Sequence, residues 1–222
     1  MADRYHYLPS IGIAVMLAWG IPLLFRNEAT HKKILFPAAI AFLAIMSVLT
    51  WKQCGYWKNS ITLFSHALKV TDDNWLAYDS RGNAYNDLGN YKQAIENLNR
   101  AIEINPDSEN AYLNRGNAYY GLGNHKQAIE NYGRAIEINP HYADAYNNRG
   151  TVYNHTGNYR QAIEDYSRAI EIKPGYSDIY FNRGFVYLNH GDNTPGCRDA
   201  QKACELGNCK LLEAAKGRGL CH

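Results

Sequence analysis

The sequence has 222 residues and a formal net charge of +2, with 23 basic and 21 acidic residues. This length allows one or two modest domains, and the near balance of charge excludes a strongly polybasic or polyacidic surface. We therefore expect no nucleic-acid partner.

Two long uncharged segments open the chain, at residues 5–25 and 34–51, and neither contains Asp, Glu, Lys or Arg. Because about 20 consecutive apolar residues cross a bilayer as a helix, the pattern predicts a two-helix transmembrane hairpin over residues 1–52. A cleaved signal peptide is one alternative, since Arg4 precedes the first apolar run. Two buried helices of a globular domain are another, but neither segment has a polar face.

The loop between the two segments carries Arg26, Lys32 and Lys33 against Glu28. Short basic loops stay on the cytoplasmic side of a membrane, so this loop is expected to be cytoplasmic. Everything after Trp51 is then expected to lie on the non-cytoplasmic side. That side is the periplasm for a protein of the inner membrane, or the ER lumen in a eukaryote.

Three consecutive segments, residues 77–106, 111–140 and 145–174, have nearly the same sequence. Glycines recur every 34 residues, at Gly82, Gly116, Gly150 and Gly184, and prolines recur with the same period, at Pro106, Pro140 and Pro174. This period with these residues resembles the tetratricopeptide repeat (TPR) over roughly residues 75–208. The resemblance implies an all-α fold, a right-handed superhelical solenoid.

Each repeat also predicts an antiparallel helix pair without reference to the family. Tyr78, Gly82 and Tyr85 share one face of a first helix, and Gly89 suits the left-handed residue that ends it. The inner face of a second helix is expected at Ala94, Leu98 and Ala101. A single pair cannot bury its apolar face, so the pairs stack, and the first helices line a concave side.

The ends of the repeat array depart from the pattern. One period before Leu98 lies Phe64, so residues 56–70 predict the second helix of an incomplete leading repeat. In the last repeat a second helix is expected to start at Pro195. The expected domains are the hairpin at 1–52, a degenerate leading half-repeat at 53–74, TPRs at 75–108, 109–142 and 143–176, a divergent TPR at 177–208, and a cysteine-containing C-terminal capping helix at 209–222.

Asparagine is frequent on the concave face of the first helices. Two residues before the recurring glycines stand Ser80, Asn114, Asn148 and Asn182, and directly after them stand Asn83, Asn117, Thr151 and Phe185. An asparagine amide both donates and accepts, so a ladder of amides suits the backbone of an extended peptide. The predicted peptide-binding residues are Asn83, Asn114, Asn117, Asn148 and Asn182. A merely solvated polar face is the alternative.

An arginine precedes each recurring glycine, at Arg81, Arg115, Arg149 and Arg183. Long arginine stems pack between repeats while the guanidinium reaches an acidic group or a carbonyl. Capture of a phosphate or carboxylate ligand is the alternative. Charged residues of the second helices, such as Lys92 and Glu96, are expected to be solvated.

Four of the five cysteines lie near the end of the chain, at Cys197, Cys204, Cys209 and Cys221. Cys197 and Cys204 stand two turns apart on one helix, about 10 Å, which is too far for a bond. An antiparallel hairpin favours the nested pairing of Cys204 with Cys209 and of Cys197 with Cys221. A zinc site is the alternative, although the cysteines form no CxxC pair. Cys54 is expected to be inert or lipidated.

The sequence contains no nucleophile elbow, phosphate-binding loop, HExxH motif or acid–base pair. We therefore expect no enzyme activity, no cofactor and no metal. The expected function is that of a membrane-anchored scaffold that binds a protein or an extended peptide on the non-cytoplasmic side.

The beginning of the chain supports a second interpretation. The residues Ala2-Asp3-Arg4-Tyr5 with Leu8-Pro9-Ser10, followed by a second apolar segment and the half-repeat, resemble the C-terminal part of membrane O-mannosyltransferase-like proteins that carry TPRs. That family places its catalytic carboxylates in an early loop that this sequence lacks, so no catalytic role passes to Asp3. The resemblance implies an acceptor-binding part of a glycosyltransferase without its catalytic spans, working with a partner glycosyltransferase subunit.

Overall fold

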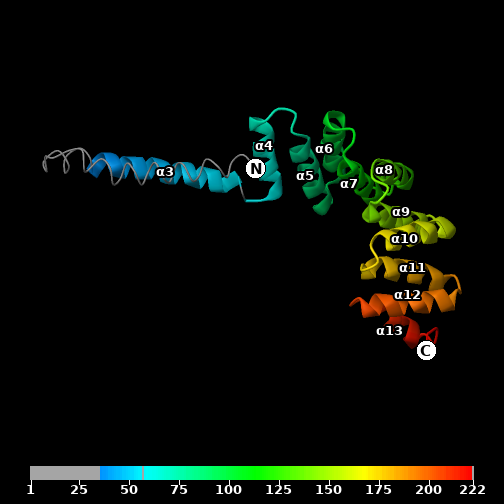
Figure 1. Cartoon of the computed structure of the whole chain (residues 1–222). Coiled ribbons are helices and arrows are strands. Elements are labelled where there is room, and N and C mark those ends of the chain that lie inside the picture. The colour runs from blue at the N-terminus through cyan, green and yellow to red at the C-terminus, as the bar shows by residue number, and fades with distance from the viewer. Residues whose placement is uncertain (1–35, 57, 222) are drawn as a thin grey trace. The chain divides into compact units, whose positions relative to one another are not determined.

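The computed structural model describes residues 36–56 and 58–221, and all regular structure in this part of the chain is α-helical (Figure 1). The chain divides into two compact units, with the boundary between Lys58 and Asn59. Helix α3 belongs to the first unit, and helices α4 to α13 form the second.

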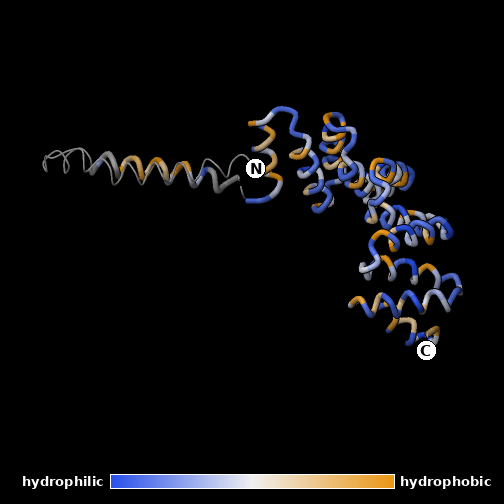
Figure 2. Tube along the Cα trace, viewed as in Figure 1, coloured by the Kyte–Doolittle hydropathy of each residue, from blue (hydrophilic) through white to orange (hydrophobic). Residues whose placement is uncertain are grey.

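Helix α3 (Phe36–Tyr56) covers most of the second expected transmembrane span, residues 34–51. Several of its described apolar side chains are exposed, including Leu43 and Val48, each 61% exposed. Figure 2 shows hydrophobic segments recurring along this helix. No described helix, however, is both long and apolar enough to cross a membrane.

The prediction of two transmembrane helices is therefore wrong for the residues that the structure describes. The first expected span, residues 5–25, and the basic loop lie outside the described residues. The predicted localisation was a membrane with the repeats on its non-cytoplasmic side. It depended on that hairpin, so the same finding contradicts it.

The second unit is a solenoid of helix pairs (Figure 1). A single helix, α4 (Ser60–Val70), precedes the pairs, and α13 (Lys210–Gly217) follows them. The pairs are α5 (Trp75–Asp87) with α6 (Tyr91–Ile104), α7 (Glu109–Gly121) with α8 (His125–Ile138), α9 (Ala143–His155) with α10 (Tyr159–Ile172), and α11 (Ser177–Asn189) with α12 (Asn193–Glu205). Helix α12 begins at Asn193, two residues before Pro195, at which the sequence predicted its start.

The turn within each pair uses a left-handed glycine. Gly89 has φ 73° and Gly123 has φ 75°, a region that other residues rarely adopt. The backbone N–H of Gly89 donates to the carbonyl of Asn86, and that of Asn90 donates to the carbonyl of Tyr85. These bonds satisfy the last carbonyls of the first helix and reverse the chain.

The two helices of a pair approach closely because the recurring glycine has no side chain. A Cβ added at Gly82 would lie 2.7 Å from Leu98 Cγ, and one added at Gly116 would lie 2.6 Å from Tyr132 Cε1. Around this contact the inner face predicted for the second helix is buried, since Ala94, Leu98 and Ala101 are all fully buried.

The first helices also touch one another from pair to pair, α5 with α7, α7 with α9, and α9 with α11. Contact between first helices of successive pairs places them on the inner side of the stack. Helix α4 packs against α5 at one end, and α13 covers α11 and α12 at the other. The inner side therefore runs from α5 to α11, with α4 next to its first helix.

Candidate functional site

Three asparagines of the ladder link successive repeats. The side-chain Nδ2 of Asn114 donates to Asp79 Oδ1, that of Asn148 to Asn117 Oδ1, and that of Asn182 to Asn147 Oδ1, each at 3.0 Å. Each bond joins a first helix to the first helix of the preceding repeat. The ladder is thus part of the solenoid's own hydrogen bonding, and its three amides are half-buried.

These bonds leave part of each amide available. An asparagine side chain has two N–H groups and one carbonyl oxygen, and the inter-repeat bond uses one N–H. The Oδ1 atoms of Asn114 and Asn182 accept no hydrogen bond from any residue that the structure describes, whereas that of Asn148 accepts from Asn147 at 3.3 Å. The bond to the neighbouring repeat fixes the direction in which the remaining groups point.

The residues that follow the glycines behave differently from one another. Asn117 Oδ1 accepts from the hydroxyl of Tyr132 at 2.8 Å as well as from Asn148, so its carbonyl is occupied. Thr151 Oγ1 accepts from Tyr166 at 3.2 Å. Asn83 is exposed and Phe185 is 42% exposed. Asn117 therefore serves the packing between helices more than the open surface.

A pocket of about 340 Å³ opens at the α4 end of the inner side. It is formed between α4, α5 and α7, and it brings the predicted residues Asn83 and Asn114 together. Its lining is Ser60, Phe64, Asp79, Ser80, Asn83, Ala84, Asp87 and Asn114. The predicted residues Asn148 and Asn182 do not line it.

Asp79 is the buried charge of this pocket, with 7% of its surface exposed. Burial raises the pKa of its carboxyl group, and the hydrogen bond from Asn114 acts in the opposite direction. Sequence reasoning missed Asp79. The sequence did hold one signal, which is that an acidic residue stands at this repeat position only in the first repeat. The equivalent positions one to three periods later hold Leu113, Asn147 and Phe181.

The arginines before the glycines are held between helices. Arg149 reaches both carboxylate oxygens of Asp165, and Arg183 reaches those of Asp199. In the first two repeats the partners are amides, so Arg81 donates to Asn97 at 2.8 Å and Arg115 donates to Asn131 at 2.7 Å. These contacts match the structural role that the sequence favoured, and they leave the arginines little freedom to capture a ligand.

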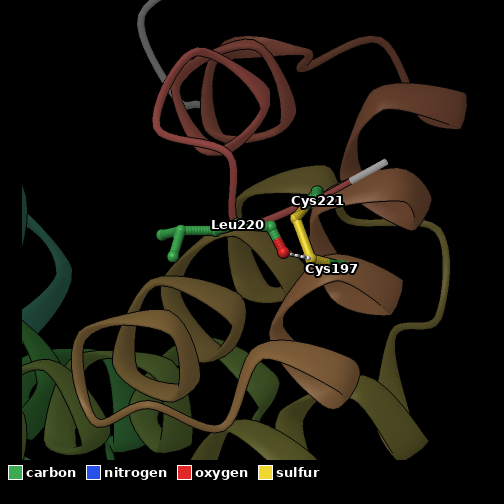
Figure 3. The surroundings of a disulfide bond; sticks show 3 residues. All are labelled: Cys197, Leu220 and Cys221. Atoms are coloured by element: carbon green, nitrogen blue, oxygen red, sulfur yellow. Dashed lines mark hydrogen bonds between the residues drawn. A yellow bond between two sulfur atoms is a disulfide. The ribbon is translucent and has the colours of Figure 1, made fainter.

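The C-terminal cysteines are paired in the structure as Cys204 with Cys209 and as Cys197 with Cys221. Figure 3 shows the second of these bridges. This nested arrangement stays a prediction for the isolated protein. The carbonyl oxygen of Leu220 lies 3.2 Å from Cys197 Sγ, next to the first bridge. The bridge fastens the end of the chain to α12, and buried Leu211 and Ala215 of α13 pack beneath it.

Within the described residues, no cluster of three or more histidine, cysteine or acidic side chains is arranged to hold a metal ion. The charged residues Lys92, Glu96, Lys126 and Glu130 are exposed on the second helices. The side chains of the inner side can form hydrogen bonds through amides and hydroxyls, and two carboxylates lie at the α4 end.

Three family models match the chain. One, described as a TPR repeat, matches residues 82–123, and two, described as tetratricopeptide repeats, match residues 107–175 and 166–194.

Among curated proteins, the protein O-mannosyl-transferase F38B6.6 of Caenorhabditis elegans is 28% identical over 89 residues. The match covers 40% of this chain but only 12% of the length of that protein.

Two solved structures illustrate the similarity of fold. The crystal structure of MamA is 30% identical, with a TM-score of 0.62 over 75% of this chain and 94% of that one. The crystal structure of YrrB, described as a TPR protein with an unusual peptide-binding site, is 20% identical, with a TM-score of 0.58 over 85% of this chain and 96% of that one. By its repeat period, its helix pairs and these matches, the chain belongs to the tetratricopeptide-repeat family.

Proposed function

We propose that the chain is a scaffold that acts by binding and not by catalysis, and that the inner side of the solenoid receives an extended segment of another protein. The observation that carries this proposal is the ladder of Asn114, Asn148 and Asn182. Each amide is oriented by a bond to the preceding repeat, and each keeps hydrogen-bonding capacity for a ligand.

Pre-orientation matters because binding costs free energy whenever a side chain has to be ordered. Amides that are already held by the fold lose little further freedom when a peptide backbone pairs with them. A ladder with the period of the repeats also presents similar groups at regular intervals, which suits an extended backbone more than a compact ligand. The fold is shared with YrrB, which is described as having an unusual peptide-binding site, and this supports peptide binding by the repeats here.

The test is affinity for peptides selected from a random library on the full chain. We compare the wild-type chain with a triple variant, Asn114→Ala, Asn148→Ala and Asn182→Ala. Because each hydrogen bond contributes roughly 1 kcal/mol, the triple variant should bind the selected peptides at least about tenfold more weakly. It also loses three inter-repeat bonds, so binding is measured well below its melting temperature, after circular dichroism shows helical content like that of the wild type.

The matched control changes three exposed residues of the second helices, Lys92→Ala, Lys126→Ala and Arg160→Ala. This control should bind like the wild type. Equal loss in both triple variants, or normal binding by a folded ladder variant, would refute the proposal and leave the repeats as a spacer or an oligomer interface.

The match to the C. elegans O-mannosyl-transferase favours a second candidate function. In this second candidate function, the repeats bind the acceptor protein of a glycosyltransferase, and the catalytic part of that enzyme lies outside these repeats. A transcript that joins this chain to an upstream reading frame for a catalytic domain would favour this candidate. Co-purification with a separate glycosyltransferase would favour it equally, and absence of both from native extracts would count against it.

A further inference from the structure

The pocket at the α4 end has an unusual composition for a protein whose charge is nearly balanced. Two carboxylates, Asp79 and Asp87, line it together with two serine hydroxyls and two asparagine amides, and none of the described residues that line it is basic. All of these groups offer oxygen acceptors. The pocket is therefore matched to a ligand that brings several N–H donors and a positive charge.

The position of Asp79 strengthens this match. Only 7% of its surface is exposed, and a single described hydrogen bond, from Asn114 to Oδ1, supports its carboxylate. Its other oxygen receives none from the described residues. A buried carboxylate with one neutral donor is poorly compensated, and burial accordingly raises its pKa.

The neighbouring arginine does not supply the missing charge. Arg81 lies two residues after Asp79, but its guanidinium donates to Asn97 and to Ser65, at 2.8 and 3.1 Å. An acceptor close to the pocket is also unfilled. Asn86 Nδ2 donates to the backbone carbonyl of Asn114, which fixes the amide orientation and leaves the buried Oδ1 of Asn86 without a donor.

We propose that this pocket binds a lysine or arginine side chain of the peptide that lies along the ladder. The inference rests on the proposed function and adds a residue preference to it. The aliphatic stem of the basic side chain lies against Phe64, and its charged end pairs with Asp79, with Asp87 at the exposed side of the pocket. The pocket then sets the register of the peptide, because a basic residue can occupy this place only when the rest of the chain is aligned with the ladder.

The decisive experiment compares random-peptide selections on the full-length wild-type chain and on an Asp79→Asn variant. Asparagine keeps the shape of the side chain and an acceptor oxygen for Asn114, removes the charge, and replaces the second carboxylate oxygen by an NH2 donor. The control variant is Asp107→Asn, the same substitution at an exposed residue outside the pocket. Affinities are then measured for one selected peptide and for its analogue with norleucine in place of the basic residue.

We expect peptides selected on the wild type and on Asp107→Asn to carry Lys or Arg at one fixed position, and those selected on Asp79→Asn to show no such preference. The norleucine analogue should bind the wild type about tenfold more weakly or worse, and the Asp79→Asn variant should not distinguish the two peptides. Selected peptides without a basic preference, or a preference that survives Asp79→Asn, would overturn this inference and leave the proposed function standing. Selection of no peptide at all would overturn both.

Discussion

Arg149 and Asp165 form a two-point ion pair between the helices of the third pair, with Nε and Nη2 each 2.8 Å from a carboxylate oxygen. One repeat earlier, Arg115 meets the amide of Asn131 at the same place. Burial lowers the pKa of Arg115, whereas for Arg149 the carboxylate outweighs the effect of burial and the pKa is raised. Repeats of nearly identical sequence therefore stabilise a buried arginine in two different ways.

The first prediction concerns this ion pair. Asp165→Asn should lower the free energy of unfolding by about 1–3 kcal/mol, because Arg149 then loses a charged partner in a half-buried site. Urea unfolding followed by circular dichroism measures the change. Asp107→Asn, at an exposed aspartate, is the control and should change stability by less than about 0.5 kcal/mol. Equal stability of the two variants would contradict the structural role assigned to the arginines.

The second prediction concerns the recurring glycine. Gly116→Ala should destabilise the protein by about 1–3 kcal/mol, because the new Cβ would meet the buried ring of Tyr132 at 2.6 Å. Gly133→Ala, in the interior of α8, should instead stabilise it by about 0.5–1 kcal/mol, since its Cβ would come no nearer than 3.7 Å to the Arg149 side chain. Opposite signs in thermal unfolding are expected, and the same sign for both would show that the helix pairs are not this close.

The third prediction concerns alkaline pH. Burial raises the pKa of Tyr166 to about 12, and an unfolded tyrosine ionises near pH ~10. Between these values the unfolded chain releases a proton that the folded chain keeps, so stability is full below about pH 10 and falls as pH rises towards 12. Tyr166→Phe should show a shallower loss in urea midpoints from about pH 9 to 11. An unchanged slope would mean that Tyr166 is not buried.

The fourth prediction concerns the cysteines. Mass mapping of unreduced protein from an oxidising compartment should find peptides that link Cys197 to Cys221 and Cys204 to Cys209. Cys197→Ser should then lower stability by about 2–4 kcal/mol, because the end of the chain is no longer fastened to α12. Free thiols at all four positions, or a Cys197 to Cys209 link, would contradict the nested arrangement.

Much of the fold could be predicted from the sequence because the same pattern of residues recurs in each repeat. The period of Gly82 and the inner-face pattern around Leu98 depend only on local spacing, and the buried alanines follow from it. The hairpin prediction was wrong for the described residues, because the absence of charged residues does not by itself make a helix long and apolar enough to cross a membrane.

The site was harder to foresee. Sequence reasoning could place Asn114 on the inner side, but its bond to Asp79 joins residues 35 positions apart and depends on how the first helices stack. The same stacking buries Asp79 and brings α4 against α5 to close the pocket. Neither relationship leaves a periodic trace, because Asp79 occurs in only one repeat.

The most direct test of the central claim is a ¹⁵N-edited NMR titration of the full chain that follows the side-chain amides, with a peptide selected from the random library. Our account predicts that the side-chain resonances of Asn114, Asn148 and Asn182 shift in proportion to the peptide bound, while the backbone resonances of the exposed Lys92 and Lys126 stay in place. Shifts confined to the second helices, with the three ladder amides unmoved at saturation, would contradict it.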